Sequence, residues 1–357
     1  MSSLLEKFRD MPNNEWDYFL NLNEIENPFK EIENSDFENF IEKYFSSSGK
    51  RLLLKEFKEY LQSILDNAPA ISPDRAIHTV SVFFLGIHIW KNTNIHPIFL
   101  NDTTNIRGNP TFQFIWFLSI LFHDFAESIE KKVYFDDLDD LFKKYNIEHR
   151  LTDYKKVEHI DKTLFQLIKK YYYYRRFSMK SIDHGILAGI YMYDKLIKIR
   201  RKKEAEGKAE NDNGLNWHES LEPLYATAAG AIACHNMWTT KKRSKEHSDY
   251  IKFELDALVR PTFKKIKCTD NPLLFLLGLV DTIDPIKYFM KKGITPERIL
   301  NGLDLECLED SITIINKGFT IETFKQYRDD NKRNFEGWLD LTVEEIIDNK
   351  FRIRFNN

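Results

Sequence analysis

The sequence is poor in cysteine, glycine and proline, and each shortage argues against a class of protein. Its 357 residues include three cysteines, Cys234, Cys268 and Cys307, which are far apart and form no Cys-x-x-Cys pair. A disulfide framework or a cysteine zinc site is therefore not expected, and a reducing cytoplasm is the natural compartment. The 13 glycines and 11 prolines are few for a turn-rich all-β fold and favour long helices.

The sequence also lacks a long apolar run and an excess of basic charge. The apolar run at 272–280 is shorter than the roughly 20 residues of a membrane-spanning helix, so a buried helix is expected there. Residues 1–14 are polar and acidic, unlike a signal peptide. The net charge of -3 provides no broad basic surface, so long duplex nucleic acid is not an expected partner. We therefore expect a cytoplasmic protein that does not bind a membrane.

Amphipathic and apolar segments predict a mainly helical fold. Apolar side chains recur at helical spacing in residues 51–67, with charged side chains on the opposite face. The segment 220–238 is rich in small residues, which permits close packing between helices. The apolar segments that predict helices are 72–90, 111–130, 181–204, 220–238 and 271–289.

The C-terminal part of the chain has a different pattern. Residues 311–319 and 350–355 alternate apolar and polar side chains and predict strands, and residues 341–349 predict a helix beside them. A stretch at about 201–215 has few apolar residues, and we expect a mobile loop there. The predicted regions are an N-terminal helical extension at 1–70, a helical core at 71–295, and a C-terminal extension at 296–357 with short antiparallel strands.

Five of the predicted helices each carry a polar group that burial would make costly. These groups are His78, the adjacent His123 and Asp124, His184, His235 and Asp281. A single histidine on an apolar face is usually a hydrogen-bonded core residue, so a structural helical protein is one interpretation. The repetition on five helices favours another, because His and Asp together are typical ligands of divalent metal ions that act with water and phosphate.

The order of these residues resembles that of the HD superfamily of metal-dependent phosphohydrolases. A histidine precedes a His-Asp doublet, further histidines follow, and an aspartate comes last, over about residues 70–290. The resemblance implies an HD-domain helical bundle, in which Asp124 bridges two metal ions if the site is binuclear. The residues that match the ligands of the first ion are His78, His123, Asp124 and Asp281.

The resemblance implies a less complete second metal position. His184 and His235 match the additional ligands of binuclear members, which often have two adjacent histidines at the later position. This chain has Cys234, His235 and Asn236 there. His218 is a candidate for the missing ligand, with a capping or surface role as the alternative. One or two ions of Mn, Fe, Co, Ni, Mg or Zn are expected, since His and Asp accept all of these metals.

Charged residues near the ligand positions are candidates for contacts with a substrate. Glu127 follows His123 by one helical turn and could act as a general acid or base, with a solvated helix end as the alternative. Glu130 is expected at the surface. For each of the basic residues named next as candidates for phosphate binding, the alternative is a surface position or a salt bridge. The expected catalytic residues are Asp124, Glu127 and Lys287, and the candidate phosphate-binding residues are Arg75, Arg175 and Lys287.

The resemblance implies a metal-dependent phosphohydrolase, in which a metal-activated hydroxide attacks a phosphoester. The expected substrate is a nucleotide, a cyclic nucleotide or a short oligonucleotide. One alternative is an HD nuclease that acts on single-stranded nucleic acid. Residues 171–176 interleave aromatic and basic side chains, as base-stacking surfaces do, with a helix that has one packed and one solvated face as the other interpretation. Another alternative is a non-catalytic HD module that senses a nucleotide. The sequence also leaves homo-oligomerisation open.

Overall fold

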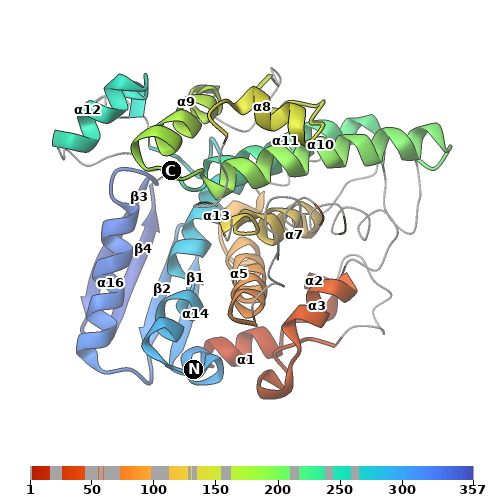
Figure 1. The fold of residues 1–357 in the computed structure, drawn as a ribbon. Helices are drawn as coiled ribbons and strands as arrows, with labels where there is room; N and C mark the ends of the chain where they lie inside the picture. Colours follow the sequence, from red (N-terminus) through yellow and green to blue (C-terminus); the bar gives the residue numbers. More distant parts are fainter. Residues whose placement is uncertain are drawn as a thin grey trace.

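The protein is mainly α-helical with a small C-terminal sheet, as the sequence predicted (Figure 1). The predicted helix at 51–67 lies outside the described residues, apart from Lys55 and Glu59. Among the described helices, none combines the length and apolar composition that a membrane span requires. The computed structural model describes residues 2–16, 26–44, 55, 59, 73–97, 112–127, 130, 135–153, 162–209, 217–237, 244–258 and 265–356.

Five helices form the centre of the molecule, and they correspond to the five predicted apolar segments. Helix α7 is apolar all round, and it contacts the other four central helices, which enclose it. It ends at His123, earlier than the predicted helix at 111–130. Helix α10 continues to Ala205, into the stretch predicted as a loop. The five helices are α5 (Pro73–Lys91), α7 (Phe112–His123), α10 (His184–Ala205), α11 (Glu222–Cys234) and α13 (Pro272–Ile283).

Glycines allow α10 and α11 to approach each other closely. A Cβ atom on Gly189 would lie 2.4 Å from the backbone oxygen of Ala229. A Cβ atom on Gly185 would lie 2.5 Å from the backbone oxygen of Ile232 and 2.8 Å from the ring of His235. No side chain larger than hydrogen fits at these positions without a shift of the helices. This contact brings the end of α11 against the beginning of α10.

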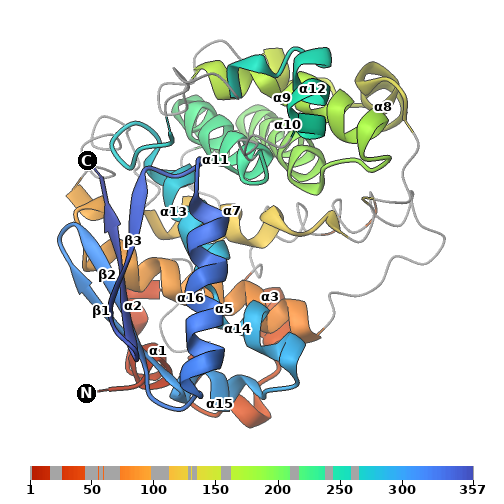
Figure 2. The ribbon, with the colours of Figure 1, turned by 90° about the vertical axis from the view of Figure 1, so that its left-hand side faces the viewer.

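The remaining helices lie around this centre. In both views α8, α9 and α12 gather at one end of the molecule, and α1, α2 and α3 lie at the opposite end (Figures 1 and 2). Their bounds are α1 (Leu4–Arg9), α2 (Asn13–Trp16), α3 (Phe37–Tyr44), α8 (Leu138–Lys144), α9 (Lys162–Ser178), α12 (Ser244–Lys252), α14 (Pro285–Phe289), α15 (Pro296–Asn301) and α16 (Ile321–Phe335).

Four antiparallel strands form a sheet in the order β1-β2-β4-β3, with α16 packed beside it (Figure 2). Ring contacts join the sheet to its neighbours: Phe351 lies 5.4 Å from Phe324 of α16, and Phe355 lies 5.4 Å from Phe275 of α13. The sheet therefore attaches to the helical centre through α13. The strands are β1 (Leu303–Leu308), β2 (Ser311–Asn316), β3 (Leu341–Ile347) and β4 (Lys350–Phe355).

One C-terminal prediction is correct and another is wrong. The strands predicted at 311–319 and 350–355 correspond to β2 and β4. The helix predicted at 341–349 is strand β3, where Leu341 and Val343 are buried and the residues between and after them are exposed. This alternation is the two-residue period of a strand, and the β-branched residues at its end favour the same structure. Strand β1 was not predicted.

We expect Gly189→Ala to reduce the free energy of unfolding by about 1–3 kcal/mol, because the new methyl group overlaps a backbone oxygen that cannot move alone. Urea denaturation followed by circular dichroism measures this change. Lys202→Ala, at an exposed position of the same helix, serves as the control and should change stability by less than about 0.5 kcal/mol. A Gly189→Ala protein as stable as the wild type would contradict the close contact.

Candidate metal centre

The structure brings together the four residues expected around a first metal ion. His78 comes from the first turns of α5, His123 ends α7, Asp124 follows it, and Asp281 lies near the end of α13. The Nε2 atom of His78 is 3.3 Å from Oδ1 of Asp281 and 3.5 Å from Oδ2 of Asp124. The Nε2 atom of His123 is 3.5 Å and 3.6 Å from the same two oxygens. All four ligand atoms lie within 4.8 Å of one another and could hold a metal ion.

A second group shares Asp124 with the first. Its Oδ1 atom lies 3.1 Å from Nε2 of His184 and 4.0 Å from Nε2 of His235. These three residues also form a group of atoms within 4.8 Å that could hold a metal ion. Asp124 therefore directs one carboxylate oxygen toward each group. Its two oxygens could therefore contribute to two different metal ions.

The histidine rings are oriented as metal ligands would be. The Nδ1 atoms of His123 and His235 each donate to a backbone carbonyl at 2.6 Å, from Ile120 and Ile232 respectively. The Nδ1 atom of His78 donates to Asp284. In the neutral form of each ring, Nε2 therefore carries the lone pair. In the described part of the chain, these three buried Nε2 atoms have no hydrogen-bond partner. A buried polar atom without a partner is costly, and a cation in front of these atoms would remove that cost.

A second layer of carboxylates holds two of the histidines. Asp284 accepts from Nδ1 of His78 at 2.8 Å, from Ser81 Oγ at 2.7 Å and from the backbone amide of Lys287 at 2.9 Å. Hydrogen bonds of this kind fix the tautomer of a metal-binding histidine and make it more basic. The sequence does not indicate this contact with His78, although an aspartate directly before Pro285 is a recognisable signal for the start of a helix.

Glu130 has the corresponding role for His184. Its carboxylate accepts from Nδ1 of His184 and from the guanidinium of Arg175, at 3.2 Å. Its side chain is only 18% exposed, so the expectation that Glu130 lies at the surface is wrong. No pattern in the sequence indicates this contact, because the two residues are 54 positions apart and belong to different segments.

The electrostatic environment keeps the carboxylates ionised. Burial raises the pKa of Asp124, but the charges of Lys287 and the neighbouring histidines outweigh burial and hold it well below its ordinary value. The pKa of Asp281 is lowered in the same way. Burial lowers the pKa of His235 to about 3, with a smaller contribution from the charge of His184. His235 is therefore neutral at physiological pH, which is the form that binds metal.

Three more of the predicted residues lie at the edge of the cluster. Lys287 Nζ is 2.8 Å from Oδ1 of Asp281 and 3.8 Å from Oδ2 of Asp124. Arg75 donates to the backbone oxygen of Asp124 at 3.0 Å and forms an ion pair with Glu127. The side chains of Arg75, Glu127 and Lys287 are 34%, 43% and 38% exposed, so they border the solvent side of the buried cluster.

The structure does not bring the other two predicted residues to the ligand atoms. Arg175 lies behind His184, where it contacts Glu130 and lies 3.9 Å from Asp183. His218 is exposed and caps the short 3₁₀ helix Glu219–Leu221, accepting from the backbone amide of Ser220. It belongs to neither group of ligand atoms.

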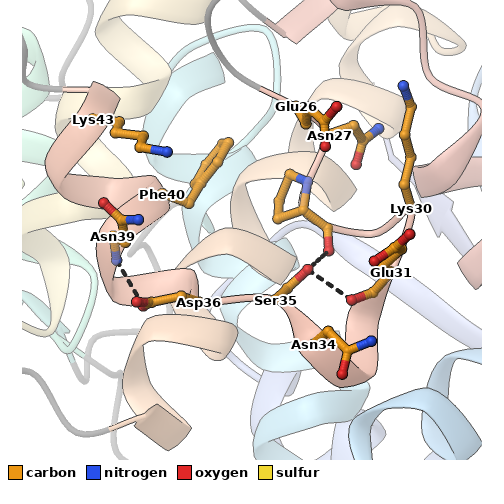
Figure 3. A pocket seen from close by; sticks show the side chains of 11 residues that line it. Glu26, Asn27, Lys30, Glu31, Asn34, Ser35, Asp36, Asn39, Phe40 and Lys43 are labelled. Atoms are coloured by element: carbon orange, nitrogen blue, oxygen red, sulfur yellow. Dashed lines mark hydrogen bonds between the residues drawn. The ribbon is translucent and has the colours of Figure 1, made fainter.

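A separate hollow of about 330 Å³ lies on the surface at α3 and the turn before it (Figure 3). Acidic and basic side chains both line it, and Asp36 accepts from the backbone amide of Asn39 at 2.9 Å. None of its lining residues belongs to the His/Asp cluster. The hollow is therefore distinct from the candidate metal centre.

Comparison with known proteins leaves the family open. No protein-family model matches the chain, and neither the curated proteins nor the solved structures contain a match. The geometry alone therefore describes the site: two overlapping buried His/Asp groups on a mainly helical protein, each able to hold a metal ion.

We expect Asp284→Asn to weaken metal binding roughly 10- to 100-fold, because the negative charge that supports His78 is removed while the size of the side chain is kept. Calorimetric titration with Mn²⁺ measures the affinity, and circular dichroism checks the fold. Asp329→Asn, on the surface of α16 with a side chain 57% exposed, is the matched control and should bind as the wild type does. Equal affinities in all three proteins would contradict the role of Asp284.

Proposed function

We propose that this protein is a metal-dependent phosphohydrolase with two cation positions bridged by Asp124. The observation that carries the proposal is that the two oxygens of this buried carboxylate face different groups of histidines. Bound divalent ions would lower the pKa of a water molecule and neutralise charge on phosphoryl oxygens. A mixed His/Asp ligand set suits ions that do this chemistry.

The residues at the edge of the cluster supply the other requirements of the reaction. Lys287 and Arg75 present positive charge beside Asp124, where they can bind the non-bridging oxygens of a phosphoester. Glu127 borders the same edge and is partly exposed, so it can accept a proton from the attacking water. The proposed substrate is a nucleotide, a cyclic nucleotide or a short oligonucleotide, because members of the HD superfamily, which the sequence resembles, cleave esters of this kind.

Asp124→Ala should reduce the hydrolysis of phosphoesters by at least about 10²–10³-fold, the loss typical when a central electrostatic group is removed. It should also remove metal from both positions, since both depend on this carboxylate. Hydrolysis of bis(4-nitrophenyl) phosphate and of 4-nitrophenyl phosphate in the presence of Mn²⁺ separates diesterase from monoesterase activity, and elemental analysis gives the metal content.

His218→Ala is the control for that measurement, because His218 is an exposed histidine outside both groups. It should retain both activity and metal. Full activity of the Asp124→Ala protein would exclude the proposed mechanism. Tight metal binding by the wild type without turnover of any phosphoester would instead favour a nucleotide-sensing module.

One observation favours single-stranded nucleic acid as a second candidate substrate. The rings of Tyr173 and Phe177 on α9 are nearly parallel, with centroids 6.2 Å apart, and Phe177 is parallel to Phe253 at 6.5 Å. Phe177 is 51% exposed. Exposed aromatic rings are surfaces on which unpaired bases stack. Arg175 of the same helix contacts Glu130, the carboxylate that accepts from His184.

If bases stack on these rings, Phe177→Ala should weaken binding of a fluorescent oligothymidine by about 1–3 kcal/mol. Fluorescence anisotropy at several salt concentrations measures the affinity, which should also fall as salt rises. Ile321→Ala changes an exposed apolar residue on a different helix, α16, and should leave the affinity for the oligothymidine unchanged. Identical affinities for the wild type and the Phe177→Ala protein would exclude this surface.

A further inference from the structure

The two candidate metal positions differ in how many donors surround them. The first has four side-chain donors, from His78, His123, Asp124 and Asp281. Among the residues that the structure describes, the second has three, from Asp124, His184 and His235. The sequence offered His218 for a fourth donor, but the structure places that residue outside the group, so a neighbouring side chain of another type has to be considered.

Asn236 lies directly beside the second group. It follows His235 in the turn after α11, and its side-chain amide is 2.9 Å from Nε2 of His184. The same Nε2 atom is 3.1 Å from Oδ1 of Asp124. The hydroxyl of Tyr171 donates to the backbone oxygen of Asn236 at 2.9 Å. The backbone is therefore held in place beside the second group, and in the structure the amide nitrogen Nδ2 is the atom that faces His184.

Whatever binds to Nε2 of His184 decides which amide atom can face it. Its Nδ1 atom is bonded to the carboxylate of Glu130 and carries a hydrogen. If Nε2 binds a cation, its lone pair is used, and an amide N–H has nothing to donate to. If Nε2 carries a proton, an amide N–H meets another donor. In both cases a rotation of the amide by 180° turns Oδ1 toward the centre, and the two orientations have nearly the same shape. When Nε2 has neither a cation nor a proton, the N–H of Nδ2 can donate to it, which is the contact in the structure.

We infer that Asn236 supplies its Oδ1 atom as the fourth protein ligand of the second cation. The inference rests on the proposed binuclear site and adds one ligand to it. An amide oxygen at this place is a harder donor than the imidazole of a third histidine would be. Hard donors favour Mg²⁺ and Mn²⁺ over softer ions. Asn236 would therefore shift the preference of the second position toward Mn²⁺ or Mg²⁺.

Three variants of Asn236 in the full chain test this assignment, with Mn²⁺ as the probe. Asn236→Ala should weaken binding of the second Mn²⁺ ion about tenfold or more and leave the first unchanged. Asn236→Asp should bind the second ion at least as tightly as the wild type, because it keeps the oxygen and adds charge. Asn236→His should raise the affinity of this position for Zn²⁺ relative to Mn²⁺. Calorimetry gives stoichiometry and affinity, and electron paramagnetic resonance detects coupled Mn²⁺ pairs.

The Asp variant separates a ligand from a positioning residue. If Asn236 acted only by donating its N–H to His184, a carboxylate could not replace it, and Asn236→Asp would be as weak as Asn236→Ala. That result would overturn the assignment, as would an Asn236→Ala protein that binds two ions with wild-type affinity. A wild-type protein that binds one ion would also overturn the assignment of Asn236, but it would be compatible with a mononuclear hydrolase. A wild-type protein that binds no ion would contradict the proposed function itself.

Discussion

The buried carboxylate of Asp124 is the constraint on which the site depends. An ionised carboxylate inside a helical core is costly unless positive charge or hydrogen bonds surround it. Here Lys287 and the neighbouring imidazoles lower its pKa, although burial raises it. The same carboxylate presents one oxygen to each group of histidines. Asp124, directly after the end of α7, therefore contributes to both possible cation positions, and its loss would remove one donor from each.

The helical packing serves this arrangement. Helix α7 is enclosed by the other central helices, which places His123 and Asp124 where α5, α10, α11 and α13 can each contribute a side chain. The second group needs an especially close contact between α10 and α11, because His184 begins one helix and His235 follows the other. Gly185 permits this contact, since any side chain there would meet the His235 ring.

The residues around the ligands divide into two sets with different exposure. Asp284 and Glu130 lie behind the histidines and orient their rings through Nδ1. Arg75, Glu127 and Lys287 lie on the other side and are partly exposed to solvent. The first set stabilises the geometry of the ligands, and the second is in reach of a molecule that enters from solvent. This division is the physical basis for the proposed reaction.

The sequence by itself determined the helical class, the central apolar helices and the polar residues that they carry, because these depend on local patterns of side chains. His78, His123, Asp124 and Asp281 stand out for that reason. The sequence was misleading at 341–349, where a short segment has both helical and strand character and the neighbouring β4 decides between them. Only the tertiary structure identified Glu130, Asp284 and Asn236 as partners of the histidines and left His218 outside the cluster. These contacts join residues far apart in the chain, and no local pattern records which helix ends meet.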